Sequence, residues 1–154
     1  MTLSVSSSFS LPVLRNGSTG SDVTLVQRLL NNAGYGSLVE DGIFGVSTDT
    51  ALKQFQKDRN LTVDGIVGSQ TWGALLPPTI GRGSSSYDVE RLQSILNEIG
   101  YSLNEIGYSL VVDGIFGSNT EAVVKGFQKN RRLEVDGIVG PLTWYALMII
   151  MITH

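Results

Sequence analysis

Apolar residues first recur with a helical period after a turn-rich stretch at residues 14–20. Val23, Val26 and Leu30 lie three and four positions apart, which places them on one face of a helix. Ser21 precedes this stripe and is predicted to be the N-cap, because its hydroxyl can accept a backbone hydrogen bond. Gly34 is predicted to end the helix, since glycine adopts the left-handed conformation common at helix ends.

A phrase that begins Asp-Gly follows this helix and occurs four times in the chain. The four phrases start at Asp41, Asp64, Asp113 and Asp136, so copies lie 23 residues apart within each half and the halves are offset by 72. Repetition at a fixed interval indicates a duplicated structural unit. The chain is therefore expected to contain one small domain twice, and each domain is expected to contain two turn-helix units.

Pro141 indicates where the helix after each phrase begins. Proline favours the first helical position, so Gly140 is predicted to be the N-cap of that helix. By analogy, glycines are predicted to cap the other three helices: Gly45, Gly68 and Gly117. In the first half the second helix is expected over residues 46–59 and the third over residues 69–76. Their expected inward-facing residues are Ala51, Leu52, Phe55, Trp72 and Leu75.

The second half repeats the first closely enough to suggest domain boundaries. Pro78 and Ile80 align with Pro12 and Leu14, so the stretch before the next helix belongs to the second copy and is not a linker. The predicted organisation is an N-terminal tail over 1–11, one domain over 12–77 and a second domain over 78–154. The expected fold class is all-α, in the form of two tandem three-helix bundles.

One stretch breaks the correspondence between the halves. The heptad at residues 96–102 is followed by an identical copy at 103–109. Seven residues are nearly two helical turns, so an inserted heptad roughly preserves the buried face. Either the first helix of the second domain lengthens through Gly100, which we favour, or the extra heptad forms a loop. A lengthened helix would protrude and offer a surface for self-association, as would the apolar C-terminal tail over 147–152.

Composition and charge exclude several classes of function. The net charge is −3, without the basic excess that nucleic acid or an anionic membrane attracts. Cysteine is absent, which excludes disulfides and cysteine-based zinc sites. The single histidine is the terminal His154, so neither a Ser-His-Asp site nor a histidine-bound zinc is expected. No apolar stretch has the length of a membrane helix, and residues 1–10 show no signal-peptide pattern.

Three interpretations of the Asp-Gly phrases are open. The favoured one is structural, because Asp accepts backbone N–H bonds in tight turns and Gly supplies positive φ. In the second, two such turns and the adjacent helix N-termini line a groove that suits a carboxylate. A calcium site is the weakest interpretation, since each phrase offers a single carboxylate. No metal and no other cofactor is expected.

Amide and aromatic side chains supply the remaining candidates for binding. Glutamines recur at matching positions of the two halves, Gln27 with Gln93 and Gln56 with Gln128. On apolar helices they suit either hydrogen bonds to the turns or contacts to ligand amides, and the sequence does not separate these alternatives. Tyrosines at the ends of the first helices, Tyr35 and Tyr101, are expected to be partly exposed and able to stack on sugar rings.

Both halves resemble the peptidoglycan-binding domain family of bacterial and phage cell-wall hydrolases. The positions that carry the resemblance in the first half are Leu14, Gly17, Gly20, Val23, Gln27, Leu30, Gly34, 41–45, Thr48, Ala51, Phe55, Gln56, Leu61, 64–68, Thr71, Trp72 and Leu75. In the second half they are Val89, Gln93, Leu96, 113–117, Thr120, Ala122, Phe127, Gln128, Leu133, 136–140, Thr143, Trp144 and Leu147. The resemblance implies a closed three-helix bundle in each domain. It also implies non-catalytic binding of peptidoglycan in the bacterial cell wall, the periplasm or outside the cell, where such domains anchor an attached hydrolase.

We interpret the chain as a tandem wall-binding module without catalytic residues. Two linked weak sites would gain avidity on a polymer. The candidate ligand-binding residues are Gln27, Tyr35, Asp41, Phe44 and Gln56 in the first domain and Gln93, Tyr101, Asp113, Phe116 and Gln128 in the second. The alternative is a protein interaction or assembly module that uses the same bundle without a wall ligand. A hydrolase that acts through paired carboxylates is the least favoured interpretation.

Overall fold

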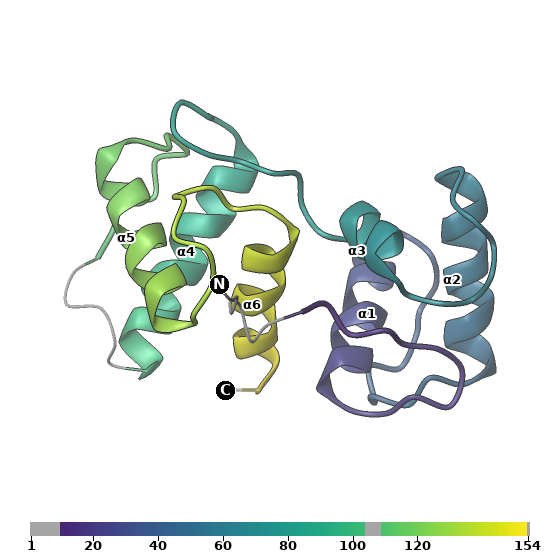
Figure 1. Ribbon diagram of the computed structural model, residues 1–154. Coiled ribbons are helices and arrows are strands. Elements are labelled where there is room, and N and C mark those ends of the chain that lie inside the picture. Colours follow the sequence, from purple (N-terminus) through teal and green to yellow (C-terminus); the bar gives the residue numbers. More distant parts are fainter. Residues whose placement is uncertain (1–9, 104–108, 154) are drawn as a thin grey trace, which may run out of the picture. The chain divides into compact units, whose positions relative to one another are not determined.

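The computed structural model describes residues 10–103 and 109–153 of the chain. Within these residues the secondary structure consists of six helices and a few isolated β-bridges, which confirms the predicted all-α class (Figure 1). The fold divides into two compact units, Leu11–Leu76 and Pro77–Ile152. We call these the first and the second unit and describe each by itself.

The first unit contains α1 (Ser21–Asn32), α2 (Val46–Asp58) and α3 (Ser69–Leu75). The prediction that Ser21 is the N-cap of α1 is wrong, because Gly20 occupies that position and Ser21 is already helical. Gly20 takes this place because its φ of 119° is a conformation that residues with side chains rarely adopt. Its N–H also donates to the carbonyl of Gly42 at 2.9 Å, which fixes the start of α1 against the first Asp-Gly turn.

The C-terminal end of α1 lies where the sequence predicted it, just before Gly34. Gly34 has a φ of 89°, and its N–H donates to the carbonyl of Asn31 at 3.0 Å. The N–H of Tyr35 donates to the carbonyl of Leu30 at 2.9 Å. Together these bonds form a Schellman motif, which satisfies carbonyls at the helix end and directs the chain away from the helix axis.

The second unit contains α4 (Tyr87–Leu103), α5 (Ser118–Asn130) and α6 (Pro141–Thr153). α4 has 17 residues where α1 has 12, so the extension through Gly100 that the heptad suggested is observed. The greater part of the second heptad copy, at 104–108, lies outside the described residues. Self-association through the lengthened helix or the C-terminal tail stays a prediction.

Helix starts follow the glycine pattern expected from Pro141. Gly45, Gly68 and Gly117 are the N-caps of α2, α3 and α5, and α6 starts at Pro141. Because glycine has no side chain, no side-chain oxygen caps the first-turn N–H groups of α2, α3 or α5. The first turns of these helices are therefore open to other acceptors.

Each unit has a core that contains one tryptophan, and both tryptophans make the same bond. The indole N–H of Trp72 donates to the carbonyl of Pro12 at 2.7 Å, and that of Trp144 donates to the carbonyl of Pro78 at 3.0 Å. The expected inward positions Ala51, Leu52 and Phe55 are buried. Leu75 is only half-buried, and the neighbouring Leu76 takes the buried position at the end of α3. The apolar faces read from the sequence thus form the core as predicted, apart from this shift at the end of α3.

The segment before the first helix of each unit pairs with both Asp-Gly turns of that unit. In the first unit the antiparallel bridges join Leu14 to Val67 and Thr19 to Ile43. The second unit repeats them as Ile80 with Val139 and Ser85 with Ile115. One short segment therefore holds the two turns of its unit together.

A left-handed residue after α5 generates a prediction about stability. Asn60 follows α2 with a φ of 58°, and Arg132 occupies the equivalent place after α5 with a φ of 59°. Asn tolerates this conformation, whereas a long side chain is strained there. We expect Arg132→Gly to raise the free energy of unfolding by about 1 kcal/mol and Asn60→Gly to change it by less.

Urea unfolding of the intact chain measures both changes. A lower stability of Arg132→Gly would show that contacts of the arginine side chain outweigh the backbone strain.

Candidate functional site

The first Asp-Gly turn is completed by the amide of Gln27, which is 1% exposed. Its Nε2 lies 3.2 Å from Asp41 Oδ1, 3.0 Å from the carbonyl of Ile43 and 3.1 Å from Thr48 Oγ1. Two amide hydrogens thus serve three acceptors, so at least one hydrogen is shared. The amide oxygen in turn accepts the N–H of Gly42 at 3.0 Å. One side chain of α1 therefore joins the turn to the start of α2.

The same arrangement occurs at all four Asp-Gly turns. Gln56, Gln93 and Gln128 place Nε2 3.1, 3.1 and 3.0 Å from the carboxylate oxygens of Asp64, Asp113 and Asp136. Each amide also donates to the carbonyl of the turn isoleucine and lies against the hydroxyl of a threonine in the next helix. The four glutamines are 0–1% exposed. Of the two alternatives left open by the sequence, the structure shows hydrogen bonds to the turns.

The Asp side chain closes each turn on itself. Oδ1 of Asp41 accepts the N–H of Ile43 at 3.0 Å, and Oδ1 of Asp113 accepts the N–H of Ile115 at 3.0 Å. These backbone N–H bonds, followed by the glutamine amides, lower the pKa of Asp41 and of Asp113 below the ordinary value of 3.8. Glycine is required beside the aspartate, because Gly42 has a φ of +74° and a Cβ there would lie 2.9 Å from the carbonyl oxygen of Gly20.

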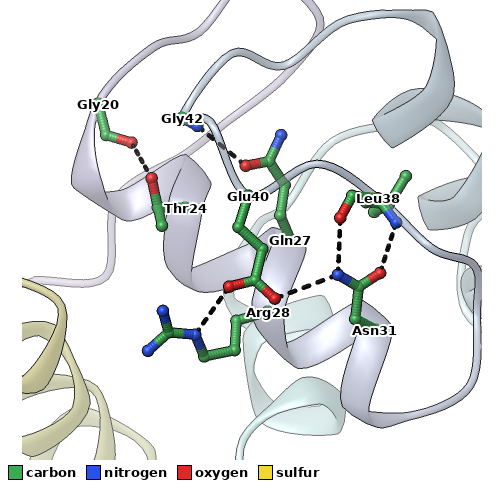
Figure 2. Close-up of polar contacts among 8 residues, drawn as sticks. All are labelled: Gly20, Thr24, Gln27, Arg28, Asn31, Leu38, Glu40 and Gly42. Atoms are coloured by element: carbon green, nitrogen blue, oxygen red, sulfur yellow. Dashed lines mark hydrogen bonds and ion pairs between the residues drawn. The ribbon is translucent and has the colours of Figure 1, made fainter.

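A second amide of α1 holds the segment that leads into the turn (Figure 2). The side chain of Asn31 donates to the carbonyl of Leu38 at 2.9 Å and accepts its N–H at 2.8 Å. Asn97 makes the same pair of bonds to Leu110, at 2.9 and 2.7 Å. Neither residue was predicted from the sequence, although each lies four positions after a glutamine, on the same helix face, in both halves.

We call the paired hydrogen bonds of Asn31 to Leu38, and of Asn97 to Leu110, the clamp. In the first unit an ion pair lies next to the clamp. Arg28 Nε lies 3.0 Å from Glu40 Oε1, and Asn31 donates to the other oxygen of Glu40 at 3.1 Å (Figure 2). Arg28 and then Asn31 lower the pKa of Glu40. Both partners of the ion pair are substantially exposed, so its contribution to stability is small.

The surface over the clamp and the turn forms a groove in each unit, which we call the turn groove. In the first unit it has a volume of about 470 Å³ and is lined by Gln27, Ser37, Leu38, Val39, Asp41, Ile43, Gly45, Val46, Ser47 and Thr48. In the second unit it has a volume of about 440 Å³ and is lined by Gln93, Ser109, Leu110, Val111, Asp113, Ile115, Gly117, Ser118, Asn119 and Thr120. The two sets occupy the same ten positions of the repeat, so duplication has produced the same groove twice.

Exposed aliphatic side chains surround this groove. Val39, Ile43 and Val46 are 72%, 59% and 77% exposed, and Val111 and Ile115 are 75% and 59% exposed. The uncapped first turns of α2 and α5 also line the groove, through residues 45–48 and 117–120. A ligand in the turn groove would therefore meet apolar surface, backbone N–H groups and one aspartate.

The first unit has a further groove along α2, which we call the helix groove. Its volume is about 830 Å³, and its lining residues are Ala33, Gly34, Tyr35, Gly36, Leu38, Val46, Ser47, Thr50, Ala51, Gln54 and Asp58. Leu38, Val46 and Ser47 also line the turn groove, so the two grooves are adjacent. The hydroxyl of Tyr35 donates to Asp58 Oδ2 at 2.8 Å, and this bond is the main cause of a raised pKa of Tyr35.

The candidate residues from the sequence fall into three groups. Asp41 and Asp113 are exposed at the turn grooves, and half-buried Tyr35 lies in the helix groove. Six others are at most 1% exposed and support the turns from the core: Gln27, Gln56, Gln93, Gln128, Phe44 and Phe116. The glutamine amides are engaged by the turns, and the two phenylalanine rings present no face to a ligand. The side chain of Tyr101 lies outside the described residues.

Two other kinds of feature are absent from the part of the chain that the structure describes. The described residues contain no group of three or more His, Cys, Asp or Glu residues that could hold a metal ion. None of the helices in this part of the chain has the length and apolar character needed to cross a membrane.

Comparison with known families identifies the family of this chain. Residues 19–75 and 85–147 each match the family described as "Putative peptidoglycan binding domain". The chain therefore belongs to this family and carries two copies of its domain, as the resemblance of the sequence predicted. No catalytic domain is evident in it, and the family implies a cell-wall context.

Relatives of the chain are cell-wall enzymes of greater length. It is 33% identical over 116 residues to the N-acetylmuramoyl-L-alanine amidase CwlM of Mycobacterium tuberculosis, covering 68% of this chain and 27% of the relative. It is 31% identical over 162 residues to a "Probable N-acetylmuramoyl-L-alanine amidase" of Bacillus licheniformis, covering 91% of this chain and 46% of the relative. A solved structure, the SleB N-terminal domain, is 38% identical with a TM-score of 0.42, covering 44% of this chain and 93% of that one. The chain thus spans less than half the length of these two amidases.

The buried amide network yields a prediction about stability. We expect Gln27→Leu to lower the free energy of unfolding by about 3 kcal/mol or more, because the N–H of Gly42 and the carbonyl of Ile43 lose their buried partner. Gln70→Leu, at an exposed position of α3, is the matched control and should change it by less than about 0.5 kcal/mol. Urea unfolding measures both, and equal effects of the two substitutions would contradict a structural role of the buried amide.

The lowered pKa values of Asp41 and Asp113 predict acid sensitivity. Since the folded-state pKa lies below the ordinary value of 3.8, the unfolded chain binds more protons at acidic pH. The stabilisation is complete above this value and is lost as the pH falls through the folded-state pKa. We expect Asp41→Asn/Asp113→Asn to flatten the fall of the unfolding free energy between about pH 5 and pH 2.

Unfolding curves at several pH values test this expectation. Glu40, whose pKa is also lowered, leaves a residual slope in the double variant. An unchanged slope would show that the two turn carboxylates do not contribute to acid sensitivity.

Proposed function

We propose that the chain binds bacterial peptidoglycan without catalysis and that the turn grooves of both units are the binding surfaces. The observation that carries the proposal is the recurrence of one groove at the same ten positions of each repeat. A structural need explains the buried glutamines and phenylalanines. A structural need does not explain the exposed aliphatic residues Val39 and Val46, because folding buries little of their side-chain surface and so yields little hydrophobic stabilisation.

The groove chemistry suits a ligand with both apolar and polar parts. Peptidoglycan offers N-acetyl groups and peptide carbonyls, which can accept hydrogen bonds from the uncapped first turns of α2 and α5. Its methyl groups can contact the rim formed by Ile43 and Val46 or by Ile115. Asp41 and Asp113 remain candidates for ligand contact, while the six buried candidates position the turns.

Two weak sites in one chain fit a polymeric ligand. When the first unit is bound, the second searches a small volume that contains many repeats of the same polymer, so the apparent affinity exceeds that of either site. We infer that the chain anchors an enzyme to the wall, as its similarity to longer amidases suggests. The proposed location is the bacterial cell wall, in the periplasm or outside the cell.

Steric blocking of the grooves tests the proposal. Ser47 and Asn119 are exposed residues at equivalent places in the two turn grooves. Replacement of one by Trp should lower the apparent affinity for insoluble peptidoglycan about tenfold or more, and replacement of both should abolish cosedimentation. Lys57→Trp/Lys129→Trp is the matched control, because both lysines are exposed near the helix C-termini and outside both turn grooves.

Chitin and cellulose serve as control polymers in the same assay. A folded Ser47→Trp/Asn119→Trp variant that pellets like the parent protein would rule out the turn grooves as the binding surface. A parent protein that stays in the supernatant with peptidoglycan would rule out wall binding itself and favour the alternative of a protein assembly module.

A further inference from the structure

The helix groove of the first unit is built by residues one helical turn apart on α2. Thr50, Gln54 and Asp58 follow one another at intervals of four, so their side chains share one face of the helix. Tyr35, just beyond the end of α1, lines the same groove and contacts Asp58. The groove shares Leu38 and Ser47 with the turn groove, so the two grooves lie next to each other.

The polar groups of this groove are held in place by one another. Asp58 accepts the hydroxyl of Tyr35 at 2.8 Å on one oxygen and the amide of Gln54 at 3.0 Å on the other. The ring of Tyr35 meets the ring of Phe55 edge to face, with centroids 5.3 Å apart and an angle of 83° between the planes. An arrangement fixed in this way costs little further ordering when a ligand binds.

Each of these groups keeps hydrogen-bonding capacity. A carboxylate oxygen has a second lone pair, a phenol oxygen accepts while it donates, and an amide has a second N–H and an acceptor oxygen. Three groups on neighbouring positions can therefore bind the adjacent hydroxyl and acetamido groups of a sugar ring. The small residues Gly34 and Gly36 beside Tyr35 leave room for such a ring to approach.

Charge decides between the two chemical parts of the polymer. Asp58 is the one acidic residue among those that line the helix groove, and the guanidinium of Arg59 lies beside it, over the ring of Phe55 and next to Tyr35. Stem peptides carry free carboxylates, whereas the glycan strand is a neutral chain of N-acetylated sugars once its lactyl groups are amide-linked. A groove whose one acid and neighbouring cation offset each other suits the neutral part of the polymer. The groove therefore fits the glycan better than the peptide.

The second unit lacks the equivalent side chains. α2 and α5 both have 13 residues, and the offset of 72 places Ala122, Gly126 and Asn130 where the first unit has Thr50, Gln54 and Asp58. The amide, the carboxylate and the hydroxyl of the first unit are thus replaced by a glycine, an amide and a methyl group. These replacements leave one hydrogen-bonding side chain where the first unit has three.

We propose that the first unit carries a glycan subsite next to its turn groove, formed by Tyr35, Gln54 and Asp58, of which the two α2 side chains have no equivalent on α5. This inference rests on the proposed wall binding and makes the two units unequal. The first unit binds a longer glycan segment and dominates the affinity, while the second adds avidity through its turn groove.

Binding to glycan strands that an amidase has freed of stem peptides, and whose exposed lactyl carboxylates are then converted to methylamides, tests this subsite. We expect Gln54→Ala/Asp58→Ala to lower the affinity of the full chain for these strands about tenfold or more, because several hydrogen bonds to a bound sugar are lost. Asn130→Ala, at the equivalent place in the second unit, is the matched control and should leave the affinity unchanged. Tyr35→Phe keeps the ring on Phe55, so a lower affinity of this variant reports the lost hydroxyl and not a loss of folding.

A gain-of-function variant completes the test. Ala122→Thr/Gly126→Gln/Asn130→Asp transfers the α2 residues to α5. This variant should bind the peptide-free strands more tightly, the opposite of the loss expected in the first unit. Unchanged binding by Gln54→Ala/Asp58→Ala overturns the subsite. Binding of intact peptidoglycan but not of the peptide-free strands by the parent protein also overturns it and leaves the proposed function standing. Failure of the parent protein to bind either polymer overturns both.

Discussion

The buried glutamine amide is the interaction on which the rest of each unit depends. An Asp-Gly turn exposes backbone N–H and carbonyl groups to the interior, and these groups are costly to bury without partners. Gln27 supplies a donor and an acceptor from one side chain and also reaches Thr48 in the first turn of α2. The same solution at Gln56, Gln93 and Gln128 fixes the angle at which each helix leaves its turn.

This constraint determines which surface is left for binding. Because the amides and the phenylalanine rings are committed to the interior, the accessible parts of the turn are the aspartate, the aliphatic rim and the uncapped helix start. Duplication copied these parts to the second unit, whereas the α2 face with Gln54 and Asp58 has no counterpart on α5. The chain thus combines a shared groove with a groove found among the residues of the first unit.

Most of the fold could be predicted from the sequence, because local signals and repetition agree. Pro141 allowed the first residue of one helix to be predicted, and the glycine N-caps of α2, α3 and α5 were inferred from it by analogy. The cap of α1 was missed because Gly20 is selected by its contact with Gly42, which no local pattern reveals. The candidate site was harder to predict from the sequence. The hydrogen-bond partners of Gln27 and Gln56 lie 8 to 21 residues away, so only the folded chain shows that the turns already bind these amides.

Backbone amide shifts on addition of soluble peptidoglycan fragments test the central claim most directly. If the turn grooves bind the wall, the largest shifts in the ¹⁵N-labelled chain will fall at Val46, Ser47 and Thr48 and at Ser118, Asn119 and Thr120. Shifts in both sets would support one groove used twice. Saturable shifts confined to other surfaces would contradict the account, since they would show wall binding that does not use the duplicated groove.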